Sequence, residues 1–270
     1  MKAIYKPNGK AGEYAQYACN LYVGCSNDCS YCYCKKYPLS KVWSTTPRLK
    51  KAFKDEQDAY EAFRKDVTEN REKLRAGGGI FFSFTTDPCL STTINLTAAC
   101  VTFATMLDVP CTILTKRTDW LIGPSVGEQM IVASKGKLAV GMSITGLDTM
   151  EVNSDSNGER LEALLHVNET FGVPVFISAE PVVDFDNVLP LLRRAIEKGV
   201  DLIKVGLMSG KSDYNRYDAT LFANRLILLA ESFGKTKIYF KDSIRKYFNG
   251  IYMVQEPEHI VVGPDYNIFK

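Results

Sequence analysis

The chain has 270 residues, of which 46% are hydrophobic and 24% are charged, and its formal net charge is +2. This composition suits one enzyme-sized domain with a large core, and the charge balance alone points to no particular partner. No signal peptide or long apolar segment is recognisable in the sequence, so we expect a cytoplasmic protein. In that reducing compartment its eight cysteines are expected to be thiols or metal ligands, not disulfides.

Three cysteines lie close together in a loop that follows the first strand-like run, 19–23. The string Gly24-Cys-Ser-Asn-Asp-Cys-Ser-Tyr-Cys-Tyr33 leaves three and two residues between Cys25, Cys29 and Cys32. Iron–sulfur cubes usually take four protein thiolates, so this set would leave one iron open to another molecule. The spacing therefore predicts a 4Fe–4S cluster with an iron at which chemistry can occur.

A zinc site that also uses Cys34 is the alternative, because four cysteines within ten residues can close a tetrahedron. Structural zinc sites usually pair two ligand clusters that are a dozen or more residues apart, and Cys34 is too close to Cys32 for an unstrained fourth corner. The chain also has only two imidazoles, His166 and His259. These features favour the iron–sulfur cluster.

The next segment, 35–76, is rich in Lys, Glu and Ala and is predicted to be a helical insertion that leads to the turn Gly77-Gly-Gly79. Residues 35–75 hold twelve Lys or Arg against seven Asp or Glu, a net charge of +5, whereas the rest of the chain has 21 against 24. Two interpretations stay open. The segment is either a basic face beside the cluster or a solvated helix face with pairs such as Glu61–Lys65.

Apolar runs then alternate with helical patterns, and the runs are continuous, as in parallel strands that are covered on both faces. The predicted helices include 159–171, 188–198 and 217–233, each followed by a glycine. This alternation predicts an α/β fold, a parallel partial barrel of about six to seven strands, in one domain (1–270) with a C-terminal extension (242–270). The predicted strands are Cys19–Val23, Ile80–Thr85, Cys111–Thr115, Leu138–Ile144, Val173–Ser178, Leu202–Leu207 and Lys237–Phe240, with an eighth candidate at Ile260–Val262.

Each of six strands ends in polar residues, and active sites of such barrels form at the carboxyl ends of the strands. A single residue of this kind is commonly a helix cap, and Asp87 and Asp184 have that alternative role. Six polar strand ends in succession indicate a ligand-lined site. Its candidate residues are Thr86, Asp87, Lys116, Ser143, Thr145 and Glu180.

These motifs together resemble the radical S-adenosylmethionine (SAM) superfamily, in particular its spore photoproduct lyase-like branch. The resemblance is carried, over about residues 14–180, by Asn20-Leu-Tyr-Val-Gly-Cys25, Tyr31-Cys-Tyr33, Thr85-Thr-Asp-Pro88, Leu114-Thr-Lys116 and Met142-Ser-Ile144. Later segments, including Glu180-Pro181 and Gly206-Leu-Met-Ser-Gly210, look more like a phage-associated radical SAM-type family of unknown function.

The resemblance implies cofactor contacts position by position. Cys25, Cys29 and Cys32 would bind the 4Fe–4S cluster, and SAM would chelate its fourth iron. Tyr31 and Tyr33 match aromatic positions beside the adenine and the cluster, and Thr86 and Asp87 match the strand end that faces the SAM amino group. Lys116 and Ser143 match strand positions whose ammonium and hydroxyl can bind the SAM carboxylate or ribose, with an ordinary surface Lys and a strand-end Ser as the alternatives. Thr145 is a further candidate cofactor contact, and Glu180 is a candidate for the ribose or for polar groups of the substrate.

One departure concerns the hydrogen atom that spore photoproduct lyase returns to its product. In that enzyme a Cys directly precedes the Thr-Ser-Asp-type motif and donates hydrogen, whereas this chain has Phe84 there. Cys89, in the following loop, and Tyr239 are the candidate catalytic replacements. A buried, inert Cys89 is the alternative.

The resemblance thus predicts an enzyme that cleaves SAM reductively to a 5′-deoxyadenosyl radical, which abstracts hydrogen from a substrate. Two substrate classes stay open: a nucleic acid or nucleotide, in a lyase-like reaction, and a protein, peptide or small metabolite. A non-catalytic iron–sulfur or zinc module is the alternative from another class. The expected partners are DNA, RNA or a nucleotide and a reductant such as flavodoxin or ferredoxin, and no membrane is expected.

Overall fold

The computed structural model describes residues 2–211, 213–248 and 256–270. Its main sheet has eight strands in the order β1-β2-β5-β6-β7-β8-β9-β10; β1 pairs antiparallel with β2, and the other pairs are parallel. The predicted parallel partial barrel is therefore confirmed, with seven parallel strands. Its strands are β1 (Ile4–Tyr5), β2 (Ala18–Cys19), β5 (Ile80–Phe82), β6 (Cys111–Thr115), β7 (Leu138–Ser143), β8 (Val175–Val182), β9 (Leu202–Leu207) and β10 (Lys237–Phe240).

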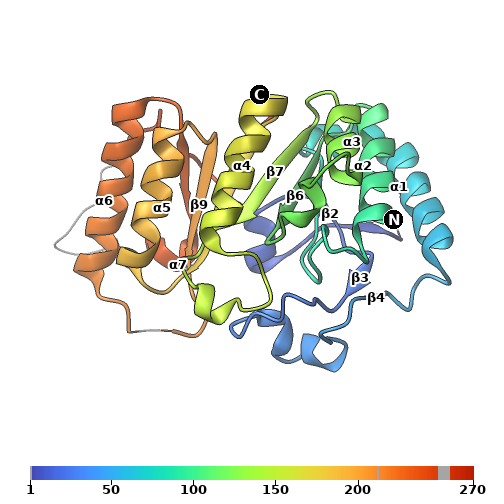
Figure 1. Cartoon of the computed structure of the whole chain (residues 1–270), viewed down its shortest axis with the longest axis horizontal. Helices are drawn as coiled ribbons and strands as arrows, with labels where there is room; N and C mark the ends of the chain where they lie inside the picture. The colour runs from blue at the N-terminus through green and yellow to red at the C-terminus, as the bar shows by residue number, and fades with distance from the viewer. Residues whose placement is uncertain (1, 212, 249–255) are drawn as a thin grey trace.

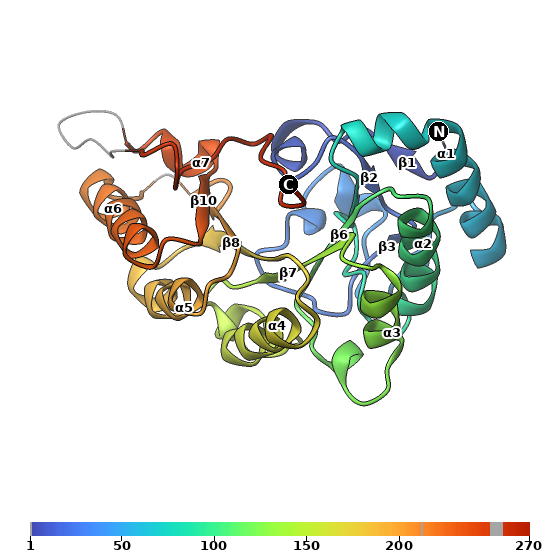
Figure 2. The same cartoon turned by 90° about the horizontal axis from the view of Figure 1, so that it is seen from above.

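The helices follow the strands in alternation and cover the outer face of the curved sheet (Figure 2). The three predicted helices form, and α4, α5 and α6 begin directly after Ser156, Asp184 and Asn215, whose side chains accept hydrogen bonds from first-turn amides. None of the described helices is both long and apolar enough to cross a bilayer. The helices are α1 (Glu56–Ala76), α2 (Ile94–Met106), α3 (Val126–Ala133), α4 (Asn157–Phe171), α5 (Phe185–Glu197), α6 (Arg216–Phe233) and α7 (Asp242–Arg245).

The first predicted strand, 19–23, is wrong as a single element. It divides into β2 and β3 (Tyr22–Val23), and β3 pairs antiparallel with β4 (Arg48–Leu49) in a separate two-stranded sheet. The division falls at Asn20, whose side chain donates to the Tyr5 hydroxyl at 2.6 Å and accepts from the Phe84 amide at 2.7 Å. These bonds turn the chain out of the main sheet, so that β3 leads into the cysteine loop.

Two other predicted segments differ in detail. In the insertion 35–76, one α-helix, α1, follows β4 and the two short 3-10 turns Tyr33–Lys35 and Leu39–Lys41. The candidate strand 260–262 makes a single bridge, from Val261 to Ile238, so it adds no full strand to the sheet.

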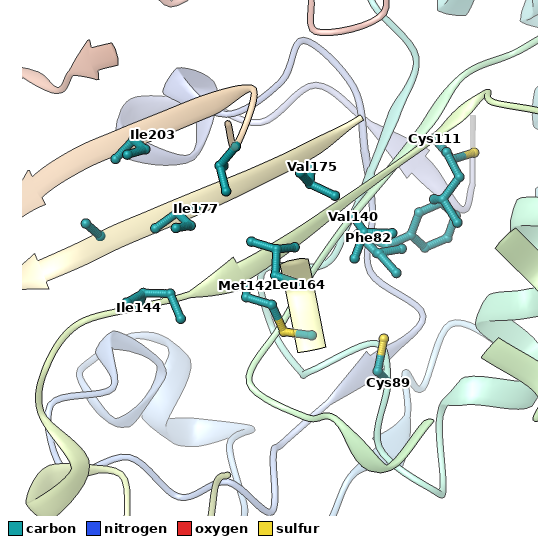
Figure 3. Close-up of a cluster of buried hydrophobic side chains, with 14 of the residues drawn as sticks. Phe82, Cys89, Cys111, Val140, Met142, Ile144, Leu164, Val175, Ile177 and Ile203 are labelled. Carbon is teal, nitrogen blue, oxygen red and sulfur yellow. The ribbon is translucent and has the colours of Figure 1, made fainter. Parts of the chain in front are cut away.

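The two faces of the sheet bury different sets of side chains, because alternate residues of a strand point to opposite faces. The outer face forms the large core under the helices, which includes Phe82, Val140 and Ile177 (Figure 3). The inner face carries a smaller apolar cluster that includes Phe81 and Phe176. The C-terminal tail packs against this inner cluster through Tyr266 and Ile268, at the end of the sheet opposite the cysteine loop (Figure 1).

One close approach on the inner face requires a glycine. A Cβ atom on Gly141, in β7, would lie 2.2 Å from the ring of Phe176 on the neighbouring β8.

Gly141→Ala should therefore lower the free energy of unfolding by about 1–3 kcal/mol through overpacking, measured by urea denaturation.

Gly158→Ala is the matched control, because the nearest atom to a Cβ there is 4.0 Å away and the residue lies in α4. It should raise the free energy of unfolding by about 0.5–1 kcal/mol, since Ala favours helix over Gly. A Gly141→Ala protein as stable as the parent would contradict the inner-face packing described above.

Candidate active site

The cysteine loop is held at the carboxyl end of the sheet by backbone hydrogen bonds to two other segments. The amide of Gly24 donates to the carbonyl of Thr85 at 3.1 Å, and the amide of Cys25 donates to the carbonyl of Ser44 at 2.9 Å. Gly24 has φ +90°, and a Cβ there would lie 2.7 Å from the Ser44 carbonyl oxygen, so the close approach needs a glycine. Figure 1 shows this part of the chain at the same end of the sheet as the segment after β7.

The three predicted cluster ligands are free thiols, with Cys29 buried and Cys25 and Cys32 half-buried. Burial raises the pKa of Cys25 to about 12. By contrast, a hydrogen bond from Cys34, assisted by Lys116 and other groups, lowers the pKa of Cys32 to about 6 despite its burial. This lowered pKa favours the thiolate of Cys32, the form that binds metals.

Among residues 2–211, 213–248 and 256–270, no three Cys, His, Asp or Glu side chains are close enough to hold a single metal ion. A four-iron cube places a different iron at each protein ligand, so its thiolates lie farther apart than the ligands of one ion.

Two buried polar atoms beside the loop fit a bound group. Asn27 Oδ1 and Thr86 Oγ1 have no hydrogen-bond partner within the described part of the chain, although buried polar atoms are normally paired. Thr86 is one of the predicted SAM contacts. The three thiols and these unpaired atoms together suit the cluster and a polar ligand next to it.

Asp87 has both carboxylate oxygens occupied by protein donors. Its Oδ1 accepts from Thr115 Oγ1 at 2.7 Å and from the Cys89 amide at 2.9 Å, and its Oδ2 accepts from Asn27 Nδ2 and the Lys116 amide, both at 2.8 Å. The structure therefore favours a role in fixing these residues over the direct SAM contact that the resemblance implies.

A second buried carboxylate, Glu151, was not found from the sequence. It accepts hydrogen bonds from Tyr31 and, at 3.0 Å, from Thr145, and its Oε1 lies 3.6 Å from Lys116 Nζ. It also pairs with Arg160 of α4. Burial opposes ionisation of Glu151, but Lys116 and Arg160 outweigh it and hold its pKa below the usual value.

One sequence signal could have indicated this pair, namely a charged residue within the apolar pattern of α4. Arg160 lies next to Leu161 and four positions before Leu164, on the buried face of α4, and it is fully buried. A charged side chain on such a face needs a buried partner of opposite charge.

Glu180 and Tyr239 lie in a different polar network, at the far half of the partial barrel. Glu180 Oε2 accepts from the Tyr14 hydroxyl at 2.7 Å and from Lys241 Nζ at 2.6 Å. The Tyr239 hydroxyl donates to Glu13 Oε1 at 3.2 Å, and Lys241 Nζ lies 3.3 Å from the other oxygen of Glu13. Sequence reasoning missed Glu13 and Tyr14, which come from the segment between β1 and β2.

The prediction that Cys89 faces the site is wrong. It is 1% exposed and belongs to the outer-face core with Phe82 and Met142 (Figure 3), because the loop after Asp87 turns toward the helices. Burial raises the pKa of its thiol far above the usual value. Cys89 is thus the inert, buried residue of the alternative interpretation.

Two further predicted contacts lie at the rim. The Tyr33 hydroxyl donates to the carbonyl of Phe84, and the side chain of Tyr33 is half exposed. Ser143 is buried at the end of β7, and its carbonyl accepts from Arg160 at 2.7 Å.

Solved structures of radical SAM enzymes have a similar fold. Spore photoproduct lyase, solved with a dinucleoside spore photoproduct, aligns with 88% of this chain and 79% of its own at 17% identity and a TM-score of 0.58. SuiB of Streptococcus suis bound to its precursor peptide SuiA aligns with 67% of this chain and 42% of its own, at 14% identity and a TM-score of 0.51. SuiB bound to S-adenosylmethionine aligns with 81% of this chain and 49% of its own, at 13% identity and a TM-score of 0.50.

The chain thus spans less than half the length of SuiB. No protein-family model matches the sequence, and neither does any curated protein. At these identities the similarity establishes the fold, and the predicted resemblance to spore photoproduct lyase is confirmed at that level.

The Asp87 network gives a stability prediction. Asp87→Ala removes the acceptor of four buried donors, so it should lower the free energy of unfolding by about 1–3 kcal/mol. Urea denaturation measures this, with Glu169→Ala on the exposed face of α4 as the control, expected within about 0.5 kcal/mol of the parent. Equal stability of Asp87→Ala and the control would show that water replaces the carboxylate without cost.

Proposed function

We propose that this chain is a radical SAM enzyme, with a 4Fe–4S cluster on Cys25, Cys29 and Cys32. The observation that carries the proposal is the position of these thiols. They lie on one loop at the carboxyl end of a parallel partial barrel, the fold of spore photoproduct lyase and SuiB. When bound, the cluster supplies one electron and SAM supplies the 5′-deoxyadenosyl radical that removes hydrogen from the substrate.

The chain's own residues bind and orient the cofactors and keep water out. Lys116 offers an ammonium group to the SAM carboxylate, and its side chain is 14% exposed, which strengthens such a pairing. The ring of Tyr31 gives the adenine a surface for stacking, and Thr86 has a hydroxyl without a partner among the described residues. A reductant of the flavodoxin or ferredoxin type delivers the electron.

The first test is anaerobic reconstitution with iron and sulfide, followed by dithionite and SAM. The parent protein should hold about four irons per chain and should form 5′-deoxyadenosine, which chromatography detects. Cys29→Ala should lose both the iron and the product. Cys100→Ala, which alters a buried thiol in the outer core, is the control that should keep both.

A Cys29→Ala protein with full turnover would overturn the cluster assignment. A reconstituted and reduced parent protein that leaves SAM intact would overturn the enzyme proposal.

For the substrate we propose a nucleic acid or nucleotide, on the basis of the segment that follows the cluster loop. Residues 33–54 contain seven Lys or Arg and no Asp or Glu. In the described part of the chain the exposed Lys36, Lys41 and Lys51 make no ion pair with a carboxylate, and Tyr37 is 76% exposed. Such cations suit phosphates, and the exposed ring of Tyr37, whose centroid lies 4.9 Å from Lys41 Nζ, suits a stacked base. The precursor peptide bound to SuiB in its solved complex keeps a peptide as the second candidate.

Salt dependence tests this proposal with a single-stranded 20-mer of thymidine. Its affinity, measured by fluorescence anisotropy, should fall with added salt, and the triple variant Lys36→Ala, Lys41→Ala and Lys51→Ala should reduce the slope of log K against log salt by about 2, at roughly 0.7 per phosphate contact. Lys198→Ala, an exposed cation after α5, should leave the slope unchanged. Absent or salt-independent binding would contradict a nucleic acid and favour a peptide or small metabolite.

A further inference from the structure

Three of the residues expected to contact SAM meet at one oxygen atom. Oε1 of Glu151 accepts the hydroxyl of Tyr31 and the hydroxyl of Thr145, and the Lys116 ammonium lies 3.6 Å away. Tyr31 belongs to the cysteine loop, Lys116 follows β6, and Thr145 follows β7. A single carboxylate oxygen therefore ties together three segments that are far apart in the sequence.

The second oxygen of Glu151 extends this connection to a fourth expected contact. Oε2 pairs with Arg160, and Arg160 Nη1 donates to the carbonyl of Ser143 at 2.7 Å. Asn157 Nδ2 lies 3.5 Å from Oε2, while Asn157 Oδ1 accepts from the Thr145 amide at 2.7 Å. The pair of Glu151 and Arg160 thus fixes the end of β7 as well.

These contacts lie in a buried environment, so each donor depends on the carboxylate of Glu151. The side chains of Glu151 and Arg160 are 0% exposed, and Lys116 Nζ lies 5.8 Å from the ring centroid of Tyr31. In such a buried site water cannot replace a lost acceptor easily, and the orientation of each donor depends on the carboxylate. The amide of Ser30, next to Cys29, also donates to the carbonyl of Met150, so the loop that carries Glu151 holds the cysteine loop directly.

We infer that Glu151 is the positioning residue of the SAM site: it orients Lys116, Tyr31 and Thr145 toward the cofactor without touching it. This inference rests on the proposed function. A Gln at this position would turn an N–H group toward donors on one side or the other, and at least one of the donors would lose its acceptor.

The test measures SAM affinity by isothermal titration calorimetry on reconstituted protein with an oxidised cluster, so that no turnover occurs. Glu151→Gln should bind SAM about 10- to 100-fold more weakly, as is typical when a group that orients direct ligands is lost, while its iron content stays at the parent level. Glu162→Gln is the matched control, because it breaks an exposed pair with Arg194 and should bind SAM as the parent does.

Glu151→Asp covers the case in which the Gln variant does not fold. It keeps the charge opposite Arg160 but withdraws the oxygens by one methylene, so its SAM affinity should lie between those of the parent and Glu151→Gln. A folded Glu151→Asp protein with parental affinity would overturn the inference.

A double-mutant cycle with Lys116→Met separates positioning from general destabilisation. If Glu151 acts largely through Lys116, the loss of affinity in the double variant should be no more than about twofold beyond the larger single effect, since coupled residues are not additive. Fully additive losses would overturn the inference. A parent protein that binds no SAM would overturn the proposed function itself, whereas parental affinity in Glu151→Gln would overturn only the positioning role.

Discussion

A buried carboxylate must be surrounded by donors, and the carboxyl end of this sheet is organised by two such groups. Asp87 accepts four hydrogen bonds, from the cysteine loop, from its own loop and from the end of β6. Glu151 accepts hydrogen bonds from Tyr31 and Thr145 and forms ion pairs with Lys116 and Arg160. The cost of leaving either carboxylate unpaired is large, so the segments are held in one arrangement. The loop with the three cysteines receives its position from both of them.

The same end of the sheet divides into two halves with different chemistry. The half formed by β5, β6 and β7 carries the cysteine loop, Asp87 and Glu151. The half formed by β8, β9 and β10 carries Glu180 and Lys241, which are joined to Glu13 and Tyr14 of the N-terminal segment. The two halves therefore carry separate polar networks, one around Asp87 and Glu151 and one around Glu180 and Lys241.

The inner face near this end is aromatic around Phe84, the residue at which the sequence departs from the family it resembles. Phe84 stacks on Phe81 with a centroid distance of 4.6 Å, and Tyr14 meets it edge-on at 5.9 Å. Cys89, in the loop between β5 and α2, is buried in the outer-face core and not in this aromatic cluster. Tyr239 lies on the inner face, and its role as a donor stays a prediction.

The sequence by itself determined the strand and helix order, the parallel sheet and the three-cysteine loop, because these depend on local periodicity, capping residues and spacing. It also placed Lys116 and Ser143 at strand ends, whereas Glu180, expected after a strand that ends at Ser178, lies inside β8. Only the tertiary structure decided that Asp87 is already saturated with donors, that Cys89 turns into the core, and that Glu151 joins Tyr31, Lys116 and Thr145. Each of these depends on which way a side chain points after a loop and on contacts between segments distant in the chain, and neither follows from residue order.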